Sequence, residues 1–507
     1  MENSWPFNSF LLVPTLLFTL LFCLNLFYHR KLNLPPGPSP WPIIGNLNLI
    51  GSLPHQSIHS LAKKYGPIMQ LRFGSYTVVV GSSVEMARYF LKTYDHNFAS
   101  RPKTAGGKYT TYNYSDMVWA PYGPYWRQAR KMCQIELFSA KRLESFEYIR
   151  IEETKLFVNG LFKSCGKPII LKDHFSNLSL NVISRMVLGK KYTEKSESEI
   201  VTPKEFKEML EELFLLNGVL DIGDSIPWVG FLDLQGYRKR MKAVMKKLDR
   251  FYEHVLDEHD GRGKNTSKDM VDVLLQLADD PSFQVKLQRH QIKALIQDLL
   301  GGGTESSMVT LEWAISEILK KPDIFKKATE ELDRVVGRNR LVQEKDISNL
   351  PFIDAIVKET MRLHPVAPML VPRVAREDCN VAGYDILKNT RVLVNVWSIG
   401  RDPAVWSRPD EFCPERFMEN KEIDVMGHHF ELLPFGAGRR MCPGYSLGLK
   451  VIRSNLANLL HGFAWKLPGD MKHEDLDMEE IFGLSTPRKF PLVAVPEPRL
   501  PLHVYSL

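Results

Sequence analysis

A single cysteine, Cys442, lies in a glycine-rich loop that leads directly into an apolar helical stretch from Tyr445 to Leu460. Glycines such as Gly438 and Gly444 allow backbone N–H groups to approach a sulfur atom closely. The positive end of the following helix dipole also favours negative charge, so we expect both features to stabilise Cys442 as a thiolate. A thiolate can ligate a haem iron and promote cleavage of the O–O bond. A lone buried cysteine is more often structural, so the neighbouring motifs must decide between the two roles.

A second unusual segment is Gly301 to Ser306 (Gly-Gly-Gly-Thr-Glu-Ser), in the middle of a helical pattern from Gln291 to Lys320. Glycine costs about 1 kcal/mol relative to alanine inside a helix, so three in succession are a poor choice for a purely structural helix. We expect the helix to break there and to leave room for O2 beside a flat cofactor. Glu305 and Ser306 would then offer a carboxyl and a hydroxyl for relaying protons. The alternative is a packing kink that carries a solvated polar pair.

Two further pairs have helical spacing. Glu359 and Arg362 lie three residues apart, which places a carboxylate and a guanidinium on one helical face. Trp126 and Arg130 lie four residues apart and also share a face. Arginine suits carboxylate ligands because its planar fork can bind one in two places. Taken alone, these pairs would be read as ordinary surface side chains.

The cysteine loop is the most specific of these signals. Five of its residues fit the pattern Phe-x-x-Gly-x-Arg-x-Cys-x-Gly, namely Phe435, Gly438, Arg440, Cys442 and Gly444. In this pattern, and in the order of its other motifs, the chain resembles the cytochrome P450 superfamily, in particular plant microsomal monooxygenases of specialised metabolism. The resemblance implies the cytochrome P450 fold, mainly α with a minor β-sheet. It also implies haem b with Cys442 as the axial iron ligand, and insertion of one oxygen atom from O2 into a small lipophilic substrate.

The resemblance also gives roles to the other motif residues. The implied haem-binding residues are Trp126, Arg130, Arg373, Phe435, Arg440 and Cys442. The implied buried charge network that holds the haem-side core consists of Glu359, Arg362 and Arg416. The implied catalytic pair departs from the commoner aspartate and threonine, because the chain has Glu305 and Ser306. Serine lacks the methyl group that restrains a threonine rotamer, so we expect a looser proton relay that releases more hydrogen peroxide.

Electrons must reach such a haem from a partner. No glycine fingerprint follows a strand and no Walker loop is present, so the chain is not expected to bind NADPH itself. The resemblance implies an NADPH–cytochrome P450 reductase that docks on the cysteine side of the haem. Two other classes stay open at this point: a haem-thiolate isomerase or dehydratase, which needs no electrons, and a non-catalytic haem sensor or carrier.

The N-terminus is expected to be a membrane anchor. Phe10 to Tyr28 is almost continuously apolar, close to the roughly 20 residues that span a bilayer. His29, Arg30 and Lys31 follow it, which indicates a cytosolic catalytic domain at the endoplasmic reticulum membrane. A cleaved signal peptide is disfavoured because the positive charge follows the apolar run. We therefore expect a single transmembrane helix in residues 1–31, in contact with membrane lipid, a stiff proline-rich hinge in 32–45 and the catalytic domain in 46–507.

The rest of the chain is typical of one large globular domain. The composition is 44% hydrophobic and 25% charged, and the net charge of +7 is spread among many acidic residues, so no nucleic-acid partner is expected. The six cysteines are scattered, without a zinc or disulfide pattern. Periodicity predicts short strands at 68–73 and 77–80 and helices at 204–216, 237–258, 291–320 and 323–336.

The substrate is the least determined part of the function. By analogy with the family, we expect the pocket to be lined by residues 112–117, 213–217, 296–302, 366–370 and 484–486. Most of these residues are apolar, which favours a lipophilic substrate but specifies little more. The resemblance favours a terpenoid slightly over a flavonoid or other phenolic. The sequence does not separate hydroxylation from oxidative C–C cleavage or ring closure.

Overall fold

The computed structural model describes residues 32–192, 200–261, 268–278, 280 and 286–506. The predicted anchor in residues 1–31 lies outside these residues. Within the described ranges, none of the helices is both long enough and apolar enough to cross a bilayer. The proline-rich segment from residue 33 to 40 has no regular secondary structure, yet it is attached to the domain: the Gln70 N–H donates to the Pro36 carbonyl, and Asn33 pairs with Asp385.

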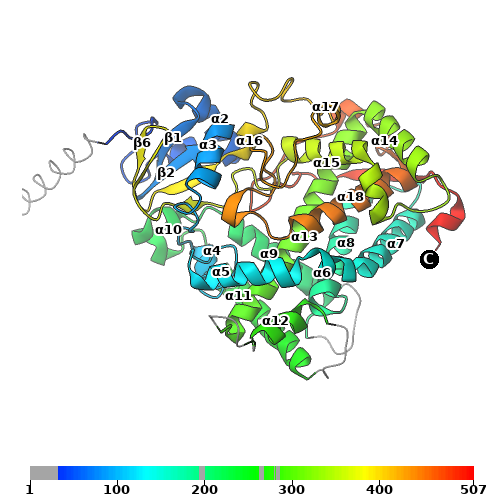
Figure 1. Cartoon of the computed structure of the whole chain (residues 1–507), viewed down its shortest axis with the longest axis horizontal. Coiled ribbons are helices and arrows are strands. Elements are labelled where there is room, and N and C mark those ends of the chain that lie inside the picture. Colours follow the sequence, from blue (N-terminus) through cyan, green and yellow to red (C-terminus); the bar gives the residue numbers. More distant parts are fainter. Residues whose placement is uncertain (1–31, 193–199, 262–267, 279, 281–285, 507) are drawn as a thin grey trace, which may run out of the picture.

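Helices dominate the described chain, as the sequence predicted. Figure 1 shows them filling most of the molecule, with the main sheet at one end. The longer helices are α2 (Pro54–Tyr65), α5 (Pro124–Met132), α7 (Glu147–Lys163), α8 (Leu171–Leu188), α9 (Pro203–Gly218), α11 (Tyr237–Asp260), α12 (Met270–Ala278), α13 (Arg289–Lys320), α14 (Pro322–Val335), α15 (Pro351–Leu363) and α18 (Tyr445–Gly462). The short helices are α3 (Val84–Arg88), α4 (Ala105–Thr110), α6 (Ala140–Ser145), α10 (Ile222–Ser225), α16 (Val396–Ile399) and α17 (Glu415–Glu419).

The main sheet has four strands in the order β1 (Ile68–Phe73), β2 (Tyr76–Gly81), β7 (Arg391–Val394) and β4 (Arg373–Val374). β1 and β4 run antiparallel to their neighbours, whereas β2 and β7 are parallel. The remaining strands are β3 (Ile169–Ile170), β5 (Cys379–Val381), β6 (Tyr384–Ile386), β8 (Phe463–Lys466) and β9 (Val493–Pro498). The sheet therefore joins the start of the chain to a segment more than 300 residues later.

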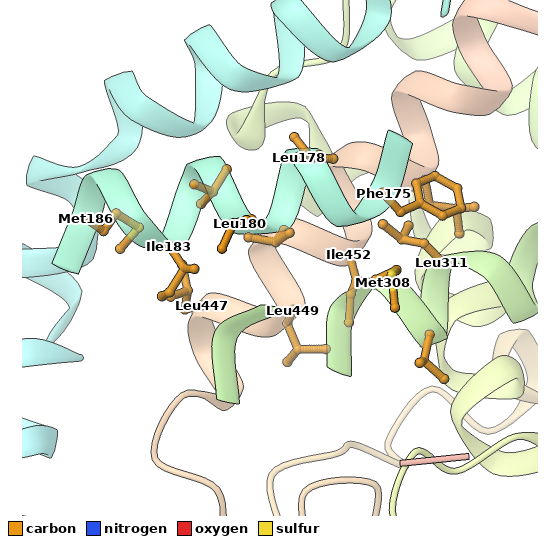
Figure 2. Close-up of a cluster of buried hydrophobic side chains, with 14 of the residues drawn as sticks. Phe175, Leu178, Leu180, Ile183, Met186, Met308, Leu311, Leu447, Leu449 and Ile452 are labelled. Carbon is orange, nitrogen blue, oxygen red and sulfur yellow. The ribbon is translucent and has the colours of Figure 1, made fainter. Parts of the chain in front are cut away.

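The core is organised around α13. This helix packs against α8 on one side and α18 on another, and Figure 2 shows apolar side chains from all three helices meeting there. Ile183 and Phe175 come from α8, Met308 from α13 and Ile452 from α18, and all are buried. α18 begins three residues after Cys442, so this packing also fixes the position of the cysteine loop.

Most of the predicted elements are confirmed, often to within two residues at each end. The predicted break in the long helix is wrong, because α13 runs without interruption from Arg289 to Lys320. Of its three glycines, Gly303 is required by close packing. A Cβ atom on Gly303 would lie 2.6 Å from the Ile183 side chain, whereas one on Gly302 would meet nothing within 4 Å. The helix tolerates the glycines because tertiary packing outweighs intrinsic propensity.

Candidate active site

Cys442 lies at the edge of an internal cavity of about 340 Å³ that is enclosed mainly by α13, α18, the end of α5, residues 366–371 and the loop 434–444. The surface of Cys442 that remains accessible faces this cavity. Apolar lining residues include Val182, Ile183, Leu299, Met361, Val366, Ala367, Leu370, Leu447, Val451 and Ile452. The cavity is large enough for a flat cofactor or a small ligand, and its wall is mostly apolar.

The cysteine loop is held in a tight conformation. Gly436 and Gly438 have φ values of 67° and 70°, a region that L side chains rarely adopt, and the Cys442 N–H donates to the Phe435 carbonyl over 3.0 Å. A Cβ atom on Gly438 would lie 2.2 Å from the Leu91 carbonyl oxygen. The loop therefore requires glycine for two independent reasons, backbone angle and close packing.

Opposing effects act on the pKa of the Cys442 thiol. Burial raises the pKa of the Cys442 thiol above its ordinary value, while the Gly444 N–H and the charge of Arg130 lower it. The stabilising groups expected from the sequence are thus present, but burial outweighs them. A metal cation at the sulfur would supply the missing positive charge, because a coordinating thiol is deprotonated outright. The site is therefore suited to a metal-bound thiolate and poorly suited to a free one.

Four arginines line the cavity: Arg101, Arg130, Arg373 and Arg440. Burial lowers the pKa of each below the ordinary arginine value. The nearby charge of Arg373 further lowers the pKa of Arg440, to about 9. Of the four, Arg373 alone forms an ion pair within the described part of the chain, with its Nη1 2.9 Å from Oδ1 of Asp95. Such a concentration of positive charge favours an anionic ligand.

Backbone carbonyls orient these guanidinium groups. Arg440 donates to the carbonyls of Ala99, Met117 and Ala120 at 2.5 to 3.0 Å. Its guanidinium carbon also lies 4.1 Å from the ring centroid of Trp126, whose indole N–H donates to the same Met117 carbonyl. A guanidinium has five N–H donors, so these contacts fix its direction and leave donors for a carboxylate. Trp126 and Arg130 both line the cavity, as their shared helical face predicted.

Arg101 is a site residue that the sequence reasoning missed. It donates to the carbonyls of Val118, Val371 and Pro372, and so ties together two segments that are distant in sequence. Its only local signal is an arginine directly before Pro102. That signal is too weak to separate Arg101 from a surface arginine without the structure.

Glu305 and Ser306 are adjacent in sequence but face different spaces. Ser306 lines the cavity with Cys442, and its hydroxyl donates to the Gly302 carbonyl over 2.9 Å. Glu305 instead lines a neighbouring pocket with Lys172, and its carboxylate accepts a 2.5 Å hydrogen bond from Ser485. Successive residues on a helix point about 100° apart, so one side chain faces the cavity and the other does not. The carboxyl and hydroxyl that were expected at one place are therefore separated.

Glu359, Arg362 and Arg416 come together in the core. The Glu359 carboxylate accepts hydrogen bonds from Arg362 at 2.7 and 2.8 Å and from Arg416 at 3.0 Å, and it is fully buried. Arg362 also donates to the backbone carbonyls of Gly400 and Pro409. This network joins α15 to the segment 400–416, which precedes the cysteine loop in the chain.

The substrate-contacting segments are only partly as expected. The expected residues that line the cavity are Met117, Asp298, Leu299, Gly302, Val366, Ala367 and Leu370. Residues 213–217 and 484–486 do not line it: Phe214, Leu484 and Ser485 line the neighbouring pocket with Glu305. These two segments therefore lie in pockets beside the cavity, one of which brings Leu484 next to Ala367 and Leu370 of the cavity wall.

The residues of the cavity fit a haem group. A buried thiol with access to the cavity supplies an iron ligand, four arginines supply partners for two propionates, and the apolar wall suits the porphyrin faces. Phe435 and Gly436 also line the cavity beside the sulfur. Together these features define a haem-thiolate site.

Comparison with known proteins agrees with this class. The family model described as Cytochrome P450 matches residues 35–493. A trimethyltridecatetraene synthase of Zea mays is 50% identical over 94% of this chain and 90% of its own length. A flavonoid 3'-monooxygenase of Petunia hybrida is 43% identical over 98% of this chain and 99% of its own. A zebra fish cytochrome P450 solved with abiraterone superposes with a TM-score of 0.76 at 27% identity, covering 89% of this chain and all of that one.

The chain belongs to the cytochrome P450 family. It is a haem-containing monooxygenase with the cytochrome P450 fold, and it takes a small-molecule substrate, O2 and electrons from a redox partner. This removes the non-catalytic and electron-free classes that the sequence alone left open.

Proposed function

We propose that the chain oxidises a small lipophilic specialised metabolite, with a terpenoid as the favoured class. The observation that carries this proposal is the enclosed and mostly apolar cavity beside Cys442. The 50% identity to a trimethyltridecatetraene synthase, and 48% identity to a dimethylnonatriene synthase of Zea mays, favour a terpenoid. The electron source is an NADPH–cytochrome P450 reductase.

The second candidate substrate class is the flavonoids. It is supported by several flavonoid hydroxylases at 40 to 43% identity that match over nearly the full chain. Their identity is lower than that of the two synthases, which is why terpenoids come first. Both classes place a lipophilic skeleton in the same cavity.

Bound haem supplies the oxidising chemistry; the residues of this chain hold and orient the reactants. Cys442 provides the ligand sulfur, and the arginines orient the haem through its propionates. The Ser306 hydroxyl faces the cavity and can hold and pass a proton there. Glu305, in the neighbouring pocket with Lys172 and Ser485, can exchange protons between that pocket and the helix face. The apolar wall excludes water around the substrate.

The proposed test is turnover in membranes that contain the chain and a plant NADPH–cytochrome P450 reductase. Acyclic terpenoids and flavanones are supplied separately, and oxidised products are identified by mass spectrometry with and without NADPH. NADPH-dependent oxidation of terpenoids, absent from membranes with Cys442→Ala, is the expected result. Oxidation of flavanones alone would replace the terpenoid assignment with the second candidate, and no oxidation of either would reject both.

Attachment to the endoplasmic reticulum membrane is also part of this proposal. Two groups of exposed apolar side chains support it: Trp41 and Ile43 before the first helix, and Trp228 and Phe231 after α10, with 62 to 81% of their surface exposed. The turn after β1 links the two groups, because Gly74 bonds to Ile44 and Ser75 bonds to Ser225. A combined apolar surface of this kind suits the lipid interface beside the predicted anchor. To test this surface, a chain lacking residues 1–31 is mixed with lipid vesicles. It should bind the vesicles, and the double variant Trp228→Glu, Phe231→Glu should no longer bind them.

The reductase is expected to dock beside α5. The inner face of this helix carries Trp126 and Arg130, which line the haem-side cavity, whereas Arg127 and Lys131 are exposed on its outer face. Positive charge close to the haem suits an acidic partner and raises the association rate. Exchanging both exposed residues for glutamate is expected to raise the KM for reductase without changing the haem spectrum. An unchanged KM would place the docking surface elsewhere.

A further inference from the structure

Asp298 is the one carboxyl that lines the cavity among the described residues. It lies on α13 four residues before Gly302 and eight before Ser306, so the three share one helical face. Eight residues of α-helix span about 12 Å. Asp298 therefore faces the same space as Ser306 but at the far end of the stretch that Gly302 leaves open.

The backbone holds this carboxyl in place without neutralising it. The Met117 N–H donates to Oδ2 of Asp298 over 2.5 Å, and the Val118 N–H also points toward the carboxyl. No lysine, arginine or histidine in the described part of the chain forms an ion pair with it. Burial and the nearby charge of Asp116 raise the pKa of Asp298. The group is thus an oriented hydrogen-bonding carboxyl inside a mostly apolar space.

A lipophilic substrate that fills the cavity displaces water from this carboxyl. The Met117 and Val118 N–H groups occupy only part of the hydrogen-bonding capacity of the Asp298 carboxyl, so a pure hydrocarbon would leave the lone pairs that face the cavity without a partner, which is costly. A hydroxyl can both donate and accept a hydrogen bond, and it pairs with a carboxyl in either protonation state. The ligand that fits this cavity therefore carries one oxygen function on an otherwise apolar skeleton.

We propose that Asp298 is the specificity-determining residue that selects a hydroxyl-bearing substrate and anchors its hydroxyl by a hydrogen bond. The inference rests on the proposed function and deepens it, since it names the kind of lipophilic molecule that is preferred. With the hydroxyl at Asp298, the carbon presented between Gly302 and Ser306 lies roughly 6 to 12 Å away, which is the rise of four to eight residues of α13. The residue thereby selects both the substrate and the region of it that is oxidised.

The test compares matched ligands that differ by one hydroxyl: farnesol against β-farnesene, and 4-phenylphenol against biphenyl. Dissociation constants are measured on the haem-loaded, full-length protein from the shift of the Soret band, without turnover. The readout is the ratio of hydrocarbon to alcohol dissociation constants, in which the different hydrophobicity of the two ligands cancels between variants. Asp298→Leu and Asp298→Ala are expected to lower this ratio about tenfold relative to the wild type.

Asp298 also contacts the 117–118 segment, so a control must separate that contact from ligand binding. Gln297 is suitable, because it is not part of the cavity wall and its side chain donates to the Thr110 carbonyl over 2.7 Å, a second link from α13 to the same region. Gln297→Leu is expected to leave the ratio within twofold of the wild type. Asp298→Asn keeps an acceptor for the Met117 N–H and a polar group facing the cavity, so its ratio should fall by less than threefold.

The outcomes separate this inference from the proposed function. A tenfold fall for either ligand pair supports the anchor; a fall for the phenol pair alone keeps the anchor and counts against the terpenoid assignment. A ratio within twofold of the wild type for both pairs, in both the leucine and the alanine variants, overturns the anchor even where turnover of a terpenoid is observed. If the variants bind the alcohol and the hydrocarbon equally more weakly, the anchor is also overturned, because Asp298 then has only a structural role.

Discussion

The cysteine side and the substrate side of the cavity are built in opposite ways. The cysteine side comes from one continuous stretch, the loop 434–444 and the helix α18 that follows it. The substrate side is assembled from residues 117–118, α8, α13 and residues 366–371, which are far apart in the chain. The residues around the iron ligand are thus close together in the sequence. The residues that select the substrate are brought together by tertiary packing, so small shifts of separate elements change the selectivity.

The largest expected effect lies on the cysteine side. Cys442→Ala removes the one thiol that lines the cavity among the described residues, so the reduced, carbon-monoxide-bound difference spectrum should lose the red-shifted Soret band of thiolate ligation, and NADPH-dependent turnover should be abolished. Cys133→Ala, at a buried cysteine outside the cavity wall, is the matched control and should keep the band. A wild-type spectrum of the histidine type would contradict the assignment of the ligand.

The buried charge network behind the cysteine side gives the next effect. Glu359→Gln leaves two arginines in the core without their shared carboxylate, and the free energy of unfolding should fall by about 3–5 kcal/mol. Chemical denaturation of the haem-loaded protein measures this. Glu411→Gln is the control, since Glu411 pairs with Arg408 at the same i,i+3 spacing but on the surface, and it should cost less than about 1 kcal/mol. Equal costs for the two would show that burial of the network is unimportant.

Substitutions at two adjacent glycines of α13 distinguish the effect of helix packing from the effect of cavity shape. Gly303→Ala brings a methyl group to 2.6 Å from Ile183 and should destabilise the protein by about 1–3 kcal/mol. Gly302→Ala meets nothing within 4 Å, so it should gain stability from helix propensity, at most about 1 kcal/mol, while narrowing the cavity. Thermal unfolding should therefore show opposite shifts. Shifts of the same sign would mean that α8 relaxes away from α13.

The smallest effect concerns proton delivery. Ser306→Ala removes the hydroxyl that faces the cavity, and hydrogen peroxide released per NADPH consumed should rise about threefold, the loss expected for one hydrogen-bonding group. Ser306→Thr restores the hydroxyl with a restrained rotamer and should lower the release below the wild-type value. Hydrogen peroxide release and NADPH consumption are measured in the same reductase-coupled assay. An unchanged ratio of peroxide to NADPH in the alanine variant would refute a role for Ser306 in coupling.

The sequence predicted the secondary structure well where the pattern was long and periodic. The bounds of α11, α14 and α18 agree with the predicted ranges to within about two residues. The failure at Gly301 to Gly303 has a clear cause: local propensity indicated a break, but contacts with α8 and α18 hold the helix continuous. Propensity is a weak guide wherever both sides of a helix are packed.

The site residues that belong to short sequence motifs were predictable, and those that depend on distant segments were not. Cys442 lies in a short, specific motif, and the cavity positions of Trp126 and Arg440 followed from the resemblance. Arg101 and Asp298 lack such a motif, because Arg101 is oriented by backbone carbonyls and Asp298 by a backbone N–H group that come from other parts of the chain. Glu305 and Ser306 face different spaces because of how α13 is rotated about its axis relative to α9 and the 484–486 segment. The sequence does not give this rotation.

The arginines beside the cavity make folding and cofactor loading a single linked equilibrium. Through their backbone contacts, Arg101 and Arg440 hold the 99–120 region against residues 371–372 and the cysteine loop, yet their charges repel one another until carboxylates arrive. A dianionic cofactor that binds only the folded chain stabilises it by mass action, about 1.4 kcal/mol for each tenfold rise in its free concentration above the dissociation constant. We therefore expect the folded fraction of the chain to rise with the concentration of free haem.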